Sequence, residues 1–235
     1  MKLFSLIHCE AKKILSSSVF WVVLVAFATM PIMLGLSTYI SAGADWATYI
    51  NDLLGTCTAL LVVGFSFTAA WVFGREYADR TITELLVKPA SRLSMVLAKF
   101  ISIFVWDVLL SFFMFTVVLT VGFFIGLDGL SWTFIGSSFL LFLGACLMIM
   151  TSSTVMALLA NVTKGYLAPI GLTFLIVVVS NVVAELGFAP YFSWTIPSLF
   201  IAHTPLMLPS YIILFMTGIV GFTATVSWWM RGEQS

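Results

Sequence analysis

The sequence predicts an all-α integral membrane protein with six membrane-spanning helices in a single domain over residues 1–235. Its composition is 61% hydrophobic and 9% charged, whereas soluble domains average about 25% charged residues. A helix needs roughly 20 apolar residues to cross a bilayer, and its backbone groups are satisfied internally. The runs of about this length lie near 19–40, 53–74, 99–126, 133–160, 166–187 and 210–230. Barrel strands alternate over about ten residues, so these unbroken runs favour helices.

The positions of the charged residues predict the topology. The basic residues are Lys2, Lys12, Lys13, Arg75, Arg80, Lys88, Arg92, Lys99, Lys164 and Arg231. The loops on the other side carry only acids, namely Asp45, Asp52, Asp128 and Glu185. Because Lys and Arg concentrate in cytoplasmic loops, we expect both termini in the cytoplasm. The first run also resembles a signal peptide, but its about 22 residues exceed the usual core of about 7 to 15, so we expect it to remain as a helix.

Residues 1–18 predict an amphipathic helix before the first span. Its apolar face is Leu3, Ile7, Ala11, Ile14 and Leu15, and its polar face is Lys2, Ser5, Lys12, Lys13 and Ser16. Such a helix lies along the inner membrane surface. It can be a plain anchor for the first span or part of a gating device, and the sequence leaves both interpretations open.

The segment 75–92 predicts a short cytoplasmic helix between the second and third spans. Thr81 and Glu84 form a capping-box pair that starts a helix. Glu84 and Lys88 stand one turn apart in the favourable order, and Pro89 disfavours helical geometry at Lys88 and so ends the helix. A rigid amphipathic helix held between two spans is suited to transmit movement, but it can also simply lie on the lipid surface.

The stretch 188–210 is too apolar for a solvated loop and too rich in proline for a seventh span. Its prolines are Pro190, Pro197, Pro205 and Pro209. Proline removes a backbone donor and breaks helices. We therefore expect a broken hairpin that dips into the outer leaflet, where it acts as a plug that seals the bundle or as an outer gate.

The third span carries charge at its start and in its interior. Arg92 and Lys99 are expected to extend to the headgroups. Asp107 follows about 12 Å deeper along the helix and should face protein or water, because a charge in lipid is costly. It either contacts a cationic substrate group or takes part in a proton-linked step, or it forms a buried hydrogen bond to the hydroxyls at 151–154.

Other polar positions within or beside the spans are weaker candidates. Asn181 and Glu185, one turn apart in the fifth span, are expected to line an exit path together with Asp107. The small residues at 151–154 and Gly144 favour close helix packing over a substrate path. No metal site is predicted, because the two histidines, His8 and His203, fall on opposite sides of the membrane.

Around the cytoplasmic segment the chain resembles the type-2 ABC transporter permeases, the six-helix membrane subunits of exporters that include bacitracin and lantibiotic export systems. The residues that carry the resemblance are Phe73, Glu76, Thr81, Leu85, Leu86, Pro89, Ser91, Arg92 and Lys99. The chain departs from the pattern at Arg80, where the family often has Gly. The resemblance extends to the amphipathic helix, the spans and the proline-rich element.

The resemblance implies that residues 76–88 form a coupling helix seated in a groove of a separate cytoplasmic ABC ATPase subunit. The implied contact residues are Glu76, Tyr77, Asp79, Arg80, Thr83, Glu84, Leu85 and Lys88. It also implies a bacterial plasma-membrane protein that pairs with a second permease, expected to be an identical copy. The implied task is ATP-driven export of an amphiphile such as an antimicrobial peptide.

The sequence agrees with that division of labour. It contains no GxxxxGK[ST] phosphate loop, so we expect no ATPase activity in this chain, with ATP and Mg²⁺ bound on the partner subunit. Two other functions stay open. One is an ion-coupled carrier that uses Asp107, and the other is a noncatalytic membrane assembly factor that recruits a cytoplasmic protein.

Overall fold

The computed structural model describes residues 3–41, 45–82 and 90–231. Its elements are α1 (Leu3–Leu15), α2 (Ser18–Ser41), α3 (Trp46–Ala78), α5 (Arg92–Ile125), α6 (Trp132–Val162), α7 (Leu167–Glu185), the 3-10 helix η1 (Ala189–Tyr191), α8 (Ile196–Ile201) and α9 (Leu208–Arg231). Six of these helices, α2, α3, α5, α6, α7 and α9, are long and apolar enough to cross a membrane. The predicted all-α class and the six spans are therefore confirmed.

Two spans begin earlier than hydropathy predicts, because polar caps start them. In α3 the carboxylate of Asp45 accepts a hydrogen bond from the Thr48 backbone N–H at 2.9 Å. In α5 the Ser91 hydroxyl accepts one from the Ser94 N–H at 3.2 Å. Such caps satisfy amide donors that the first helical turn leaves free. The first turns of both helices therefore contain polar residues that do not count toward an apolar run.

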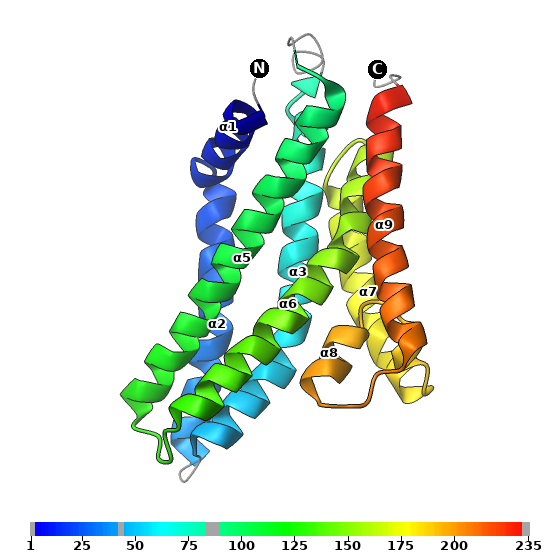
Figure 1. The fold of residues 1–235 in the computed structure, drawn as a ribbon. Helices are drawn as coiled ribbons and strands as arrows, with labels where there is room; N and C mark the ends of the chain where they lie inside the picture. Colours follow the sequence, from blue (N-terminus) through cyan, green and yellow to red (C-terminus); the bar gives the residue numbers. More distant parts are fainter. Residues whose placement is uncertain (1–2, 42–44, 83–89, 232–235) are drawn as a thin grey trace.

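The helix α3 lies at the centre of the bundle (Figure 1). It packs against α2 and α5 on one side and against α6 and α7 on the other. The N-terminal end of α1, the C-terminal end of α3 and the C-terminal end of α9 lie at the same end of the molecule (Figure 1). The C-terminal end of α2, the N-terminal end of α3 and the α5 to α6 connection lie at the opposite end (Figure 1). This arrangement agrees with the even number of spans.

The small face predicted around residues 151–154 does serve close packing, against α9. A side chain added at Gly221 would come within 2.8 Å of the Thr154 carbonyl carbon. Gly218 meets Thr151 in the same way, and the Thr154 hydroxyl lies 3.3 Å from the Gly218 carbonyl oxygen. Small residues let two membrane helices approach until their backbones touch. The predicted packing role of this face is confirmed.

The inward face of the amphipathic helix α1 overlaps only in part with the predicted apolar face. Leu6, Glu10 and Ile14 are its buried residues, whereas Leu3 and Leu15 of the predicted apolar face are exposed. The buried face points at α5, against which α1 packs. The predicted face is therefore only partly right: Ile14 is buried and Ile7 packs against the core, but the acid Glu10 at the centre of the inward side disguised the rest.

The proline-rich stretch 188–210 forms two short helices at the end of the bundle opposite the termini (Figure 1). Both η1 and α8 carry a proline in the first turn, where its missing N–H is not needed. The Ser193 hydroxyl lies 2.8 Å from that of Ser152 in α6, and Phe200 of α8 rests on Gly144. These contacts favour the interpretation as a plug.

Candidate functional site

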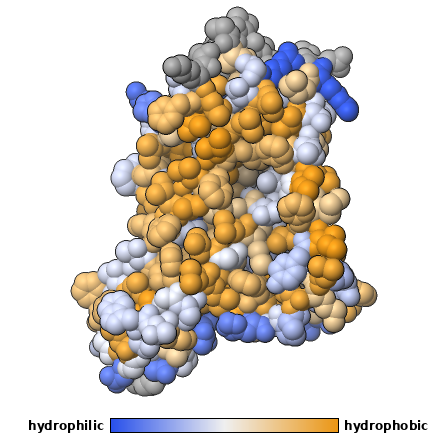
Figure 2. Space-filling model, in the orientation of Figure 1, coloured by the Kyte–Doolittle hydropathy of each residue, from blue (hydrophilic) through white to orange (hydrophobic). Residues whose placement is uncertain are grey.

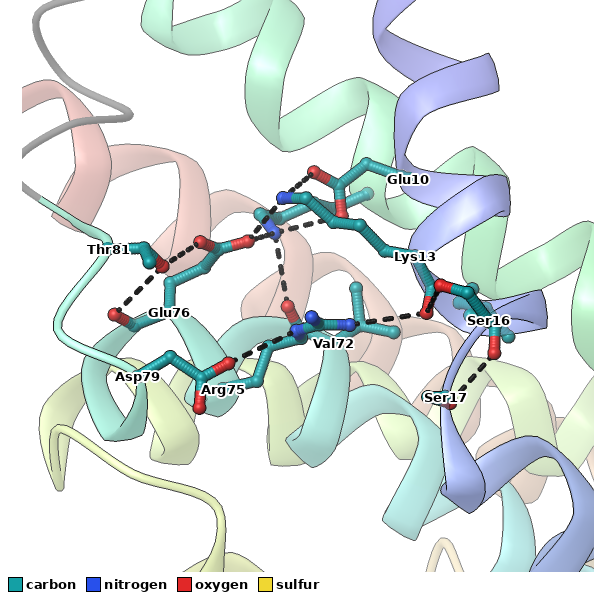
Figure 3. Close-up of polar contacts among 11 residues, drawn as sticks. Glu10, Lys13, Ser16, Ser17, Val72, Arg75, Glu76, Asp79 and Thr81 are labelled. Carbon is teal, nitrogen blue, oxygen red and sulfur yellow. Dashed lines mark hydrogen bonds and ion pairs between the residues drawn. The ribbon is translucent and has the colours of Figure 1, made fainter.

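Four charged side chains from three helices form a closed ring at the C-terminal end of α3 (Figure 3). Lys13 Nζ lies 3.0 Å from Glu10 Oε1 and 2.8 Å from Glu76 Oε1. Lys99 Nζ lies 3.1 Å from Glu10 Oε2 and 3.0 Å from Glu76 Oε1. Each ammonium thus bridges both carboxylates, and the formal charges of the ring sum to zero. The ring joins α1, α3 and α5.

The ring is buried, and its groups are well provided with partners. The side chain of Lys99 is 1% exposed and that of Glu76 is 3% exposed. Lys99 Nζ also donates to the Val72 carbonyl oxygen at 3.1 Å, so it has an acceptor for each of its three protons. The Thr81 hydroxyl donates to Glu76 Oε2 at 2.7 Å. Buried charges persist when they are paired and hydrogen-bonded in this way. The expectation that Lys99 reaches the headgroups is therefore wrong.

Lys13 is the most accessible member of the ring, with 26% of its side chain exposed. Its partial burial lowers the pKa of the ammonium, and the carboxylates of Glu10 and Glu76 raise it by more. The net result is a pKa above the ordinary value of 10.5. Lys13 therefore stays protonated at neutral pH, and the ring keeps its balance of charge.

The described ATPase-contact candidates differ in their surroundings at the end of α3. Glu76 points into the ring, and the Tyr77 hydroxyl donates to Asn161 Oδ1 at 3.3 Å. Asp79 and Arg80 are exposed. The other candidates, Thr83, Glu84, Leu85 and Lys88, lie outside the described residues, as does the part of the predicted coupling helix after residue 82. Their contact with an ATPase stays a prediction.

Arg80 occupies the position where α3 ends, in a left-handed backbone conformation with φ of 56°. The Thr81 N–H donates to the Glu76 carbonyl oxygen at 2.9 Å, and the Arg80 N–H donates to that of Tyr77 at 3.1 Å. This pair of hydrogen bonds is the Schellman motif, which usually has Gly at the left-handed position. The departure from the family pattern noted at Arg80 thus falls where glycine is preferred, and the helix ends there with Arg instead.

A second polar cluster, which the sequence analysis missed, lies beside the ring. Asn161 of α6 is fully buried, and its Oδ1 accepts hydrogen bonds from Tyr77 of α3 and from Trp229 Nε1 of α9 at 2.8 Å. Arg92 Nη1 donates to the Trp229 carbonyl oxygen at 3.2 Å. The one sequence signal for this cluster was an asparagine at the end of an apolar run.

Asp107 lies at the wall of a cavity of about 470 Å³ between α3, α5, α6 and α9. Its side chain is fully buried, and neither carboxyl oxygen has a hydrogen-bond partner among the described residues. Ser153 and Thr154 also line the cavity, but the predicted hydrogen bond from the 151–154 hydroxyls does not form. Neighbouring Thr68 donates to the Gly64 carbonyl oxygen at 2.9 Å instead.

The other two substrate-path candidates lie away from Asp107. Asn181 lines a second cavity of about 200 Å³ between α3, α7 and α8, and its Nδ2 donates to the Val177 carbonyl oxygen at 3.0 Å. Glu185 is exposed at the end of α7 and lines neither of these two cavities. The structure therefore does not bring the three residues together into one path.

Comparison with known proteins places these features in a family context. Residues 6–180 match the family described as "ABC-2 family transporter protein". The chain is also similar to the bacitracin transport permease protein BCRB of Bacillus licheniformis, with 26% identity over 194 residues. That match covers 80% of this chain and 89% of the relative. By residue number, the family match contains the four-residue ring and Asp107, and it ends before α9.

Proposed function

This chain belongs to the ABC-2 family of transporter proteins and is the membrane subunit of an ABC exporter, and we propose that its cargo is an amphiphilic compound such as an antimicrobial peptide or another toxic amphiphile. The named relative is a bacitracin transport permease, which supports this class of cargo. In this proposal the chain hydrolyses no ATP. ATP and Mg²⁺ bind to a separate cytoplasmic ABC ATPase, and two identical permeases form the membrane part.

The observation that carries the proposal is the buried ring of Glu10, Lys13, Glu76 and Lys99. It ties the C-terminal end of α3 to α1 and α5 through contacts of 2.8–3.1 Å. The segment 76–88 begins at this end of α3. A movement imposed on that segment by an ATPase would therefore be passed to three helices together, because the ring resists their separation.

The decisive experiment is co-purification of the full-length chain with a candidate ABC ATPase from the same organism, followed by ATPase and transport measurements in liposomes. We expect equimolar co-elution and ATP-dependent movement of a fluorescent cationic peptide. The variant Asp79→Lys reverses an exposed charge within the proposed contact, and we expect about tenfold weaker co-elution. Glu185→Lys makes the same charge change at the other end of the bundle and should have no effect. Equal co-elution of all three proteins would place the ATPase elsewhere.

The unpartnered carboxyl of Asp107 favours one second candidate, an ion-coupled carrier, because acids inside membrane helices commonly relay protons. The two functions differ in what drives them. Transport that persists without the ATPase and stops when an ionophore dissipates the proton gradient would establish the carrier. Transport that needs ATP and survives the ionophore would establish the exporter. An ATPase that binds this chain without any transport would indicate an assembly factor.

A further inference from the structure

We propose that the cavity beside Asp107 binds the amine-bearing apolar part of an amphiphile. This inference rests on the proposed function and gives its cargo a chemical class, a hydrophobic amine. The site would lie at the lipid-facing side of α5, α6 and α9, within the membrane.

The cavity has the size and position that such a ligand needs. Its volume of about 470 Å³ falls within the roughly 300–1,000 Å³ of pockets that hold small molecules. Figure 2, in the orientation of Figure 1, shows a hollow in the apolar face between α5 and α9. Phe104 and Phe215 line the cavity and are 49% and 65% exposed. The cavity therefore opens sideways toward lipid, and a compound dissolved in the bilayer can enter it.

The lining combines aromatic rings with one acid. Four phenylalanines contribute to the wall, namely Phe100, Phe104, Phe215 and Phe222. An ammonium group is attracted by the faces of aromatic rings and forms charge-assisted hydrogen bonds with a carboxylate. The alkyl or aryl body of the same ligand gains by leaving water for an apolar wall. A hydrophobic amine matches both parts of this lining.

Neither carboxyl oxygen of Asp107 has a hydrogen-bond partner among the residues that the structure describes. The hydroxyls nearby give their protons to backbone oxygens instead: Ser111 Oγ donates to the carbonyl of Asp107 itself at 2.8 Å, Ser153 Oγ to that of Met150 at 2.8 Å, and Thr154 Oγ1 to that of Thr151 at 2.8 Å. Buried polar atoms without a partner are rare in native proteins. A lipid chain would fill the cavity and leave both oxygens unpartnered, whereas an amine would donate to them after the carboxyl, which is fully buried, turns toward the cavity.

The test is photolabelling of the purified full-length chain in phosphatidylcholine nanodiscs, without an ATPase. The probes are diazirine-bearing dodecylamine and diazirine-bearing dodecanol, which differ only in the headgroup. Mass spectrometry identifies the labelled peptides. We expect the amine to label peptides of α5, α6 and α9 at least about tenfold more than the alcohol does. Excess unlabelled dodecylamine should abolish this labelling.

Two variants and one control refine the test. Asp107→Asn keeps the shape of the side chain and should reduce labelling by the amine to that by the alcohol. Ile219→Trp adds bulk to the α9 side of the cavity and should abolish labelling by both probes. Glu185→Gln removes an acid that lies outside the cavity and should change nothing. If Asp107→Asn fails to fold, two results still test the proposal. They are the comparison of the two probes on the wild type and the labelling of the Ile219→Trp variant.

Equal labelling by amine and alcohol in the wild type, unchanged in Asp107→Asn, would overturn the proposal and show that lipid chains fill the cavity. The absence of labelling of α5, α6 and α9 by both probes would also overturn it, as expected if a second copy covers this face. Because the assay needs no ATPase, its result is separate from the proposed function. Failure of ATPase co-elution with retained amine binding would overturn the exporter assignment alone.

Discussion

At the scale of single residues, the end of α3 has an arginine at a backbone position whose conformation favours glycine. Arg80 has φ of 56°, a conformation that side chains with a Cβ atom disfavour by roughly 1–2 kcal/mol. The two backbone hydrogen bonds of the Schellman motif hold it there. Its side chain is exposed, where a basic group can serve a partner surface. The conformational penalty and the exposed charge occur at the same residue.

Arg80→Gly should raise the free energy of unfolding by about 0.5–1 kcal/mol, because glycine adopts the left-handed conformation without a steric penalty. Thermal unfolding of the detergent-purified chain, followed by tryptophan fluorescence, measures the change. The control is Ala78→Gly, two residues earlier in the helical part of α3. It should lower stability by about 0.5–1 kcal/mol. Destabilisation by both variants would contradict the interpretation of Arg80.

At the scale of the elements, the buried ring acts as a junction between α1, α3 and α5. Its four members come from distant parts of the chain, and Glu10 and Lys99 are 89 positions apart. Removing one member leaves an unbalanced charge in the interior, whereas removing an acid and a base together restores the balance. The stability of the three-helix junction is thus expected to depend on the members jointly.

A double-mutant cycle on Glu10 and Lys99 tests this dependence. Lys99→Met should lower the free energy of unfolding by about 3 kcal/mol, because it leaves two carboxylates with one ammonium. The double variant Glu10→Gln/Lys99→Met should be more stable than the sum of the single changes predicts, by about 1 kcal/mol or more. The ion pair between Arg75 and the exposed Asp79 is the control, and Asp79→Asn should change stability by less than about 0.5 kcal/mol. Additive effects of the two ring substitutions would show that the ring is not one unit.

The raised pKa of Lys13 predicts a pH dependence on the alkaline side. The unfolded chain loses this proton near pH 10.5, and the folded protein holds it to a higher pH. The contribution of Lys13 is therefore fully present below pH 10.5 and is lost as the pH rises through the folded value.

The measurement is the unfolding midpoint from about pH 8 to about pH 12, with Lys13→Arg beside the wild type. Arginine keeps its charge over this range, so the variant should lose less stability at high pH. The neighbouring exposed Lys12 provides the control, and Lys12→Arg should follow the wild type. Identical alkaline curves for all three proteins would mean that the Lys13 proton does not contribute to folding.

At the scale of the whole molecule, polar and charged contacts hold together one end of the bundle, where α3 and α9 end, and close packing holds together the helices within the membrane. The ring and the Asn161 cluster lie at the end where the chain termini meet, and together they join α1, α3, α5, α6 and α9. Within the membrane, Gly218 and Gly221 let α9 touch α6. The cavity beside Asp107 lies where these same two helices face α5. Packing between α6 and α9 therefore also shapes the proposed binding site.

Gly221→Ala should destabilise the protein by about 1–3 kcal/mol, because the added methyl group overlaps the backbone of α6 and forces the helices apart. Gly171 in α7 is the control, since no atom lies within 4 Å of a side chain added there. Gly171→Ala should instead stabilise by about 0.5–1 kcal/mol through helix propensity. Thermal unfolding of both variants measures the difference. A neutral Gly221→Ala would mean that α9 can shift freely on α6.

The sequence by itself determined the six spans, their helical class and the position of the charged segment 75–92 between the second and third spans. These properties follow from the length of each apolar run and from the charges beside it, because the insertion of a helix into the bilayer depends on that segment and its flanks. It also located Asp107 deep within a span. The predicted starts of α3 and α5 were too late. Their first turns follow polar caps such as Asp45 and lie before the apolar runs from which the spans were predicted.

Only the tertiary structure decided which charged residues meet. Nothing local to Glu10 or Lys99 shows that they pair, because each side chain alone matches an ordinary interfacial residue. Their burial depends on two counter-charges brought in from other helices. In the same way, the lack of a partner for Asp107 depends on where the hydroxyls of α5 and α6 direct their protons. A sequence pattern records the residue types along one helix, whereas pairing and cavities arise between helices.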